Sequence, residues 1–318
     1  MKLMINRVHL EGRIYQHDLT IKTVQNQASK NFGKEFISGN VEIAVDEDGL
    51  NVIANHFTYV TEETNSGAKS PTYAALKRII DENKTWVTVG KDAAQKISIN
   101  SAIALNDFYN QNDELVSAKQ NEGGFVSFVN ELKPENERNT FDTDIVITGA
   151  EKVEKDEEKR IEEDFVRVRG AIFNFRNELL PVEYIIKNPD GMKYFEDLGA
   201  TNAAPVFTRV WGNINCLTKT NVITEESAFG EAAVRTYERK VREWLITGSP
   251  KNVYDFGDEK ILTAAELQKA AQDREVKLAD IKKRSDEYKA QKAAGNNTTT
   301  VATATTTATT VAPGGFKF

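Results

Sequence analysis

Basic and aromatic residues alternate along several segments whose pattern predicts β-strands. Successive side chains of a strand point to opposite faces, so residues two apart share a face. A sheet face with rings and cations suits single-stranded nucleic acid, because rings stack on bases at about 1–3 kcal/mol each and cations contact phosphates. The residues predicted to form such a surface are Arg13, Tyr15, Lys34, Phe36, Arg167, Arg169, Phe173, Arg209 and Trp211.

A structural interpretation of the same residues stays open at this point. Aromatic side chains such as Trp211 also cover the ends of barrels or the interface between domains. The loop from Lys30 to Lys34 combines cations, a glycine and Phe32, which suits either a clasp around a strand or an ordinary loop.

The residue types that support catalysis or metal binding are sparse. The three histidines, His9, His17 and His56, have no metal-ligand spacing, and Cys216 has no histidine near it in sequence. The chain contains no phosphate-binding loop and no dinucleotide-binding glycine motif. The acidic run at 46–48 lies in a predicted turn, where solvation explains it. We therefore predict a protein that is not an enzyme and needs no cofactor or metal.

Composition narrows the class of protein. The 318 residues suffice for two domains, and hydrophobic content of 40% is typical of a globular protein. A single cysteine excludes an internal disulfide and makes a reducing, cytoplasmic location the expectation, which is the host cytoplasm if the protein is viral. A formal net charge of −7 argues against phosphate contacts over the whole surface but allows a local basic groove.

A strand pattern appears twice and predicts two similar modules. Residues 8–15 and 166–173 both alternate, with a glycine at the same place and an aromatic residue three positions later. In the first module the order is three strands over 5–60, a helix starting at Ser70-Pro71, a fourth strand at 86–91 and further strands. This order predicts a five-stranded OB barrel, although a β-sandwich fits the spacing nearly as well.

The predicted fold class is therefore mainly β with some α, formed by tandem OB-like barrels, a C-terminal helix and a disordered tail. A segment within 225–247 could be helical, and Thr263 with Glu266 forms a capping box for the later helix. The tail is rich in Thr and Ala and ends with Phe316 and Phe318, predicted to bind a partner. The predicted boundaries are 1–153 for the first module, 154–163 for a charged linker, 164–260 for the second module, 261–294 for the helix and 295–318 for the tail.

The first half of the chain resembles bacterial and bacteriophage single-stranded DNA-binding proteins. The resemblance covers roughly residues 5–153 and is carried by the segments Asn6-Arg7-Val8-x-Leu10-x-Gly12-Arg13, Val87-x-Val89-Gly90-Lys91, Asp144-Ile145-Val146-Ile147 and Ala150-Glu151-Lys152-Val153. It implies an OB fold, stacking aromatics, no cofactor and a tail tip that recruits replication or repair proteins. Two features depart from that family, namely the lysine in the tail tip and the second module. A tandem arrangement suits a divergent bacteriophage protein.

These observations together predict a protein that coats and protects single-stranded DNA during replication or recombination. Binding is expected to tolerate any sequence, and no membrane partner is expected. The alternative is a structural or assembly protein, such as a virion component, whose aromatic faces form subunit interfaces.

Overall fold

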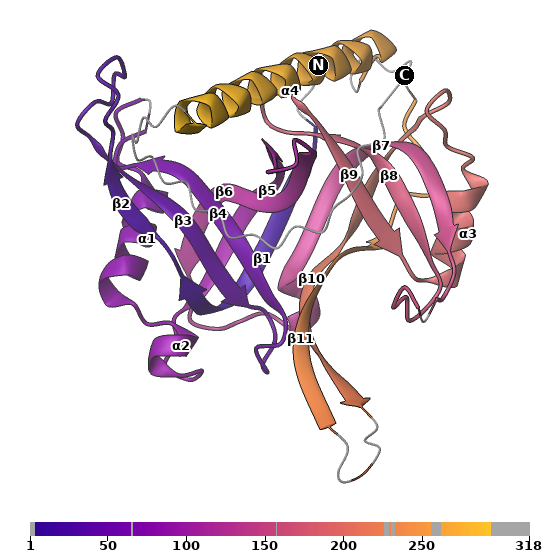
Figure 1. The fold of residues 1–318 in the computed structure, drawn as a ribbon, viewed down its shortest axis with the longest axis horizontal. Coiled ribbons are helices and arrows are strands. Elements are labelled where there is room, and N and C mark those ends of the chain that lie inside the picture. The colour runs from indigo at the N-terminus through magenta and orange to yellow at the C-terminus, as the bar shows by residue number, and fades with distance from the viewer. Residues whose placement is uncertain are drawn as a thin grey trace.

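The chain folds mainly into β-strands, as the computed structural model shows (Figure 1). The structure describes residues 4–293 except 65, 157, 226–228, 230–232 and 256–261. The strands are β1 (Asn6–His17), β2 (Thr20–Thr23), β3 (Glu35–Ala44), β4 (Val52–Thr61), β5 (Lys96–Tyr109), β6 (Leu115–Phe128), β7 (Asn139–Val153), β8 (Phe165–Phe173), β9 (Leu179–Ile186), β10 (Val206–Glu225) and β11 (Ala233–Gly248). The helices are α1 (Pro71–Glu82), α2 (Trp86–Val89), the 3₁₀ turn η1 (Glu135–Glu137), α3 (Pro189–Asp197) and α4 (Ala264–Ala293).

Barrel one is a closed ring of five strands. Going round it, β1 pairs with β3, β3 with β4, β4 in parallel with β6, β6 with β5, and β5 again with β1. Helix α1 lies between the third and fourth of these strands in the chain and begins as predicted, with the Ser70 side chain accepting a hydrogen bond from the Tyr73 backbone N–H. This ring and helix have the topology of an OB fold.

Barrel two repeats the same ring with different strands. β7 pairs with β8 and β10, β8 pairs with β9, and β10 pairs with β11. The ring closes through the parallel contact of β9 and β11, at the single pair Ile185–Leu245. Helix α3 again lies between the third and fourth strands. The predicted tandem of OB-like barrels is confirmed, and neither module is a β-sandwich.

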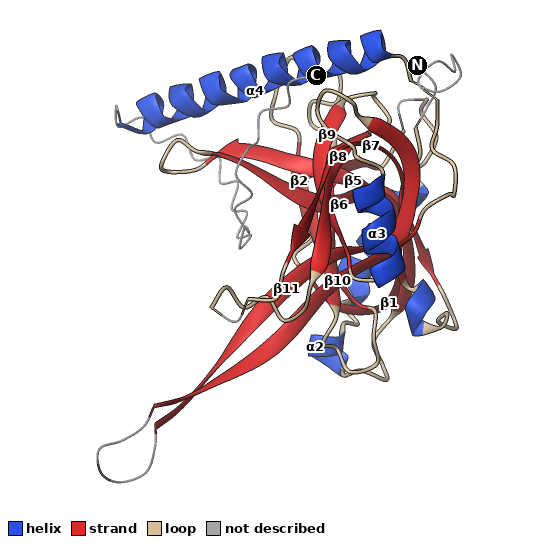
Figure 2. Cartoon of the chain, turned by 90° about the vertical axis from the view of Figure 1, so that its right-hand side faces the viewer, coloured by secondary structure: helices blue, strands red, loops and turns tan. Residues whose placement is uncertain are grey.

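The two barrels are joined by backbone pairing and by the C-terminal helix. β1 pairs with β7, and one apolar core runs through both barrels. Helix α4 crosses the top of both barrels (Figures 1 and 2). Its N-terminal part packs Leu267 and Ala270 into a second core on barrel two, and its Arg274 forms an ion pair with Asp107 of barrel one. The capping box predicted at Thr263 and Glu266 is present.

Strands β10 and β11 continue well past barrel two. Residues 219–225 and 233–239 pair only with each other in the antiparallel ladder, and we call them the arm. The arm projects from the side of the molecule opposite α4 (Figure 2). No helix among the described residues has the length and hydropathy that crossing a membrane requires.

The module boundary differs from the one predicted. The first module was expected to extend to residue 153, whereas β7 closes barrel two by pairing with β8 and β10. The repeated glycine pattern therefore falls on strands that are not equivalent, since β1 is the first strand of its barrel and β8 the second. Gly12 and Gly170 do share one role: a Cβ there would lie 2.1 Å and 2.4 Å from a backbone oxygen of the neighbouring strand.

Two local predictions of secondary structure were also wrong. The expected strand at 86–91 is the short helix α2, because Thr85 and Thr88 form a capping box in which each side chain accepts from the other's backbone N–H. The possible helix within 225–247 is strand β11, whose pairing with β10 outweighs its weak local pattern. The predicted tail at 295–318, with Phe316 and Phe318, lies outside the described residues.

Candidate nucleic-acid interface

The outer face of β3 and β4 carries a pair of aromatic side chains, of which Tyr59 is exposed and Phe36 is half-buried. The rings of Phe36 and Tyr59 lie 4.7 Å apart between centroids at 38°. An irregularity in the β3–β4 pairing between Ile37 and Gly39 accompanies the exposure of both Thr58 and Tyr59, and the Tyr59 side chain is 45% exposed. Strands two and three of an OB barrel form its usual oligonucleotide face. Phe36, which the sequence predicted, therefore lies on the expected surface beside a ring that the sequence analysis missed.

A groove runs between this face of barrel one and the base of the arm. We call it the inter-barrel groove. Its barrel-one wall comes from β3, β4, β5 and β6, and its other wall comes from β10 and β11 of barrel two. The side chains that define it here are Asn40, His56, Lys119, Gln120, Asn121, Cys216, Lys240, Arg242 and Trp244. The groove thus combines cations, amides and rings with one acid, Glu42 of β3, along one channel.

Lys240 and Arg242 are the free cations of the groove. They are two residues apart on β11, so they share the face that also carries Trp244. Both side chains are exposed, and neither has an ion-pair partner within the described ranges. Two cations on the wall of a groove, without an ion-pair partner in the part of the chain that the structure describes, are chemically suited to contact phosphates.

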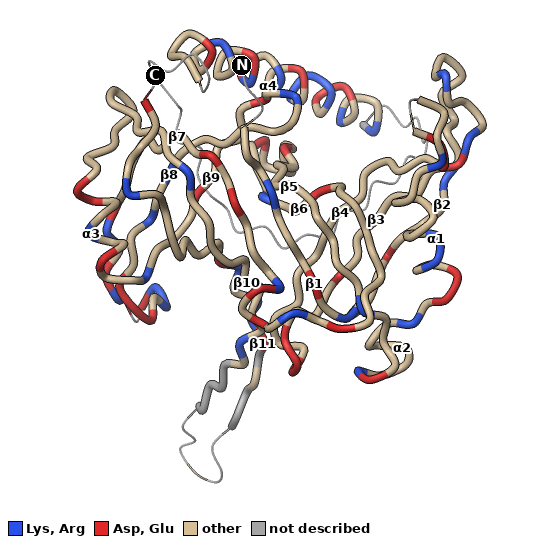
Figure 3. Tube along the Cα trace, turned by 180° about the vertical axis from the view of Figure 1, so that it is seen from behind, with Lys and Arg blue, Asp and Glu red and all other residues tan. Residues whose placement is uncertain are grey.

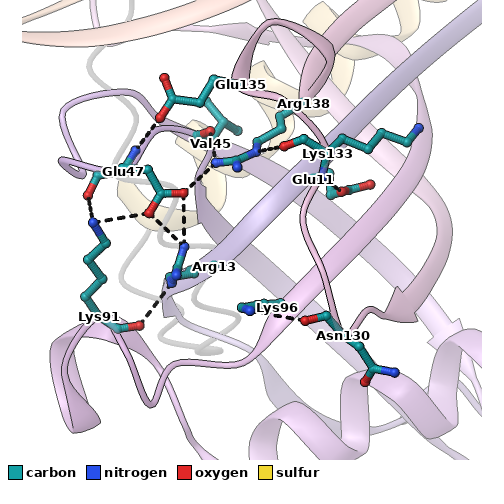
Figure 4. Close-up of polar contacts among 10 residues, drawn as sticks. All are labelled: Glu11, Arg13, Val45, Glu47, Lys91, Lys96, Asn130, Lys133, Glu135 and Arg138. Atoms are coloured by element: carbon teal, nitrogen blue, oxygen red, sulfur yellow. Dashed lines mark hydrogen bonds and ion pairs between the residues drawn. The ribbon is translucent and has the colours of Figure 1, made fainter.

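Arg13 lies in a cluster around one carboxylate and is not free to bind phosphate (Figure 4). Its Nη1 lies 3.2 Å from Glu47, its Nε donates to the Lys91 carbonyl, and its side chain is largely buried. Arg138 and Lys91 contact the same carboxylate at 2.9 and 3.2 Å. The hydrogen bond from Arg138, with those from Lys91 and the charge of Arg13, lowers the pKa of Glu47 to about 2.

Tyr15 and Lys34 are each engaged by a neighbour. The Tyr15 ring lies 6.0 Å from the ring of Trp86 in α2. The Lys34 ammonium forms an exposed ion pair with Glu63 at 3.0 Å, an interaction that a phosphate can replace at small cost. The two residues have different neighbours, because Lys34 is in the loop before β3 whereas Tyr15 packs toward α2.

The two predicted arginines of β8 share a face but are paired with acids. Arg167 contacts Glu183 of β9 at 3.0 Å, and Arg169 contacts Glu151 of β7 at 2.9 Å and Glu183 at 3.5 Å. Figure 3 shows the same interspersion of cations and anions over both barrels. The acids that pair with these two arginines come from β7 and β9, so they were not visible from the β8 sequence.

The expectation that Phe173 stacks on a base is contradicted by the structure. Its side chain is fully buried. It packs in the second core with Leu179, Leu262, Leu267 and Ala270. The face assignment from alternation fails here because the α4 segment, far away in sequence, covers this end of β8.

Arg209 and Trp211 lie on the same face of β10 but differ in how available their side chains are to a ligand. Arg209 forms a two-point ion pair with Asp142 of β7 through Nε and Nη2, so its charge is largely used. Trp211 is 41% exposed and lies against Gly248 of β11, where a Cβ would meet the indole Nε1 at 2.4 Å. Trp211 keeps an accessible ring, whereas Arg209 links two strands.

The most accessible cations of the groove escaped the sequence analysis. Lys240, Arg242 and Trp244 alternate along β11, a signal that was present but hidden because the segment was interpreted as a possible helix. Lys119 carries no such signal, since its position depends on contact between the barrels. Cys216 is buried and its thiol is free.

The strand order of the two rings defines a tandem OB-fold protein, mainly β with a C-terminal helix. The model of the YorF family matches residues 5–284, so the chain belongs to that family. No curated protein matches the sequence. Among solved structures, it is similar to a deletion mutant of the single-stranded DNA binding protein from Thermus aquaticus, with 11% identity and a TM-score of 0.46 over 81% of this chain and 100% of the other.

Proposed function

We propose that this protein binds single-stranded DNA in the inter-barrel groove and along the adjoining face of β3 and β4. The observation that carries the proposal is the placement of Lys240 and Arg242, which have no ion-pair partner among the described residues, opposite an OB face that carries the aromatic pair Phe36–Tyr59. Phosphates would contact the cations and bases would stack on the rings. Stacking requires no particular base, so the binding tolerates any sequence.

The same proposal includes the biological role. A chain with two fused barrels and no recognisable catalytic constellation in its sequence suits coating and protection of single strands during replication or recombination, in the cytoplasm of a cell or of a phage host. DNA, rather than a catalytic substrate, is the proposed partner.

Titration of the protein with fluorescently labelled oligo-dT, monitored by anisotropy, tests the proposal. We expect tight binding at low salt, similar affinity for a mixed-sequence single strand, and weaker binding to the corresponding duplex. Absence of binding to oligo-dT at low salt overturns the proposal. A large stable oligomer that ignores DNA would instead favour an assembly protein.

The salt dependence of DNA binding tests whether the DNA lies in the inter-barrel groove. Each phosphate contact on a single strand contributes about 0.7 to the slope of log K against log salt. The double variant Lys240→Ala/Arg242→Ala should therefore lower the magnitude of the slope by about 1.4. The control Lys77→Ala/Lys193→Ala removes two cations from helices α1 and α3 outside the groove and should leave the slope unchanged. Equal slopes for both double variants would place the DNA elsewhere.

A further inference from the structure

Lys119 lies where the two barrels meet. It belongs to β6 of barrel one, and its ammonium donates a hydrogen bond of 2.5 Å to the Glu183 carbonyl on β9 of barrel two. The same nitrogen lies 4.9 Å from the centroid of the Tyr184 ring and 4.6 Å from that of the Trp244 ring. One side chain of barrel one therefore contacts both β9 and β11 of barrel two.

Those two strands form the weakest side of barrel two. β9 and β11 are paired at Ile185–Leu245 alone, whereas β10 pairs with the whole length of β11, from Trp211–Gly248 to Glu225–Ala233. We call this contact the seam. Backbone hydrogen bonding contributes little at the seam. The Lys119 side chain, which contacts both strands, therefore contributes more than a single side chain usually does to keeping the seam closed.

The seam also sets the position of the groove. Trp244 lies on the same face of β11 as Arg242 and Lys240, so the place of its ring determines where both cations lie relative to barrel one. A cation over an aromatic face is attracted by the ring, and the attraction grows when water is excluded. Lys119 supplies such a cation from the opposite wall of the same groove.

We propose that Lys119 is the positioning residue of the groove, holding the β9–β11 seam so that Lys240 and Arg242 face the β3–β4 surface. The inference rests on the proposed DNA binding. It assigns to Lys119 no contact with DNA, because its ammonium is turned to the Glu183 carbonyl and the two rings.

The charges around Lys119 fit this role. The Glu183 carboxylate is occupied by Arg167 and Arg169, and Glu243 of β11 is paired with Lys187. Within the described residues no carboxylate lies within ion-pair distance of Lys119. Its ammonium interacts instead with the Tyr184 and Trp244 rings and with the Glu183 carbonyl. Burial lowers the pKa of Lys119 to about 7, and the nearby Glu183 charge partly opposes that shift.

Hydrogen exchange and DNA affinity, both measured at pH 6 where the Lys119 amine is protonated, test the inference on the same samples. In Lys119→Met, which keeps the length of the side chain but removes the ammonium, we expect amides of β9 and of residues 242–246 to exchange about tenfold faster while those of β3 and β4 are unchanged. Affinity for oligo-dT should fall about tenfold. Lys119→Arg should recover part of both losses, because it restores a cation at the rings.

The matched control is Lys193→Met, which removes one exposed cation from α3. It should alter neither seam exchange nor affinity. Wild-type exchange at the seam and wild-type affinity in Lys119→Met overturn the inference while leaving DNA binding intact. If wild-type protein does not bind oligo-dT, the proposed function fails, and exchange alone still decides whether Lys119 holds the seam. Should Lys119→Met not fold, Lys119→Arg and Lys119→Gln provide the same comparison.

Discussion

The rings of Phe36 and Tyr59 contact each other across β3 and β4, at 4.7 Å between centroids. Tyr59 is largely exposed and Phe36 half-buried, so the pair presents one apolar surface to solvent without closing the core. This surface adjoins the inter-barrel groove along the same two strands, as the β3 and β4 residues of its wall show.

Replacing either ring should weaken DNA binding. Stacking of one base on an aromatic side chain contributes about 1–3 kcal/mol, so Tyr59→Ala should lower affinity for oligo-dT by roughly fivefold to a hundredfold. Phe36→Ala should have a smaller effect, because its ring is partly covered. Phe175→Ala removes an exposed ring from barrel two and serves as the control. Equal affinities for Tyr59→Ala and Phe175→Ala would argue against stacking at this pair.

The carboxylate of Glu47 should stabilise the fold in a pH-dependent way. Its folded pKa is lowered to about 2, so its contribution is complete above its ordinary pKa and is lost as pH falls through the folded value. Because the side chain is 42% exposed, we expect Glu47→Gln to cost only about 1 kcal/mol at neutral pH. Urea unfolding at pH 7 and pH 3 measures this difference, which should shrink at the lower pH. A constant difference would exclude the charge as its cause.

Lys119 should make stability rise with pH above neutrality. Burial lowers its folded pKa to about 7, whereas the unfolded chain keeps its proton up to about pH 10. Between these values the unfolded state binds more protons, so the free energy of unfolding rises by up to about 1.4 kcal/mol per pH unit. Below pH 7 both states are protonated and the effect vanishes. Urea unfolding at pH 6, 7.5 and 9 should show this rise in wild-type protein relative to Lys119→Met, and parallel curves would contradict it.

The ion pair of Arg274 with Asp107 should decide whether α4 stays on barrel one. Both side chains are nearly buried, and the nitrogen–oxygen distance is 2.9 Å. Removing one partner of a buried pair leaves the other uncompensated and costs about 3–5 kcal/mol. Arg274→Met should therefore increase hydrogen exchange in the C-terminal half of α4, with barrel amides unaffected. The control Arg284→Met removes an exposed pair with Asp280 within α4 and should have little effect.

Local sequence patterns predicted the strands and helices well where neighbouring residues alone specify them. Alternation located β1, β3 and β4, and the caps at Ser70 and Thr263 located the starts of α1 and α4. The candidate site was predicted less well. Trp211 is accessible as expected and Phe36 partly so, but the four arginines contact acids from other strands or, for Arg13, from the turn after β3; they are Arg13, Arg167, Arg169 and Arg209.

The sequence by itself determined that this protein is mainly β, with a capped helix after its strands, because side-chain periodicity and capping act over a few residues. Only the tertiary structure decided that β7 belongs to barrel two, that α4 buries Phe173, and that Lys240 and Arg242 lie opposite barrel one with no ion-pair partner among the described residues. Each of these depends on which distant segments meet. Strand pairing and ion pairing between segments far apart in the sequence follow from the closure of the whole barrel. Local sequence patterns therefore do not predict them.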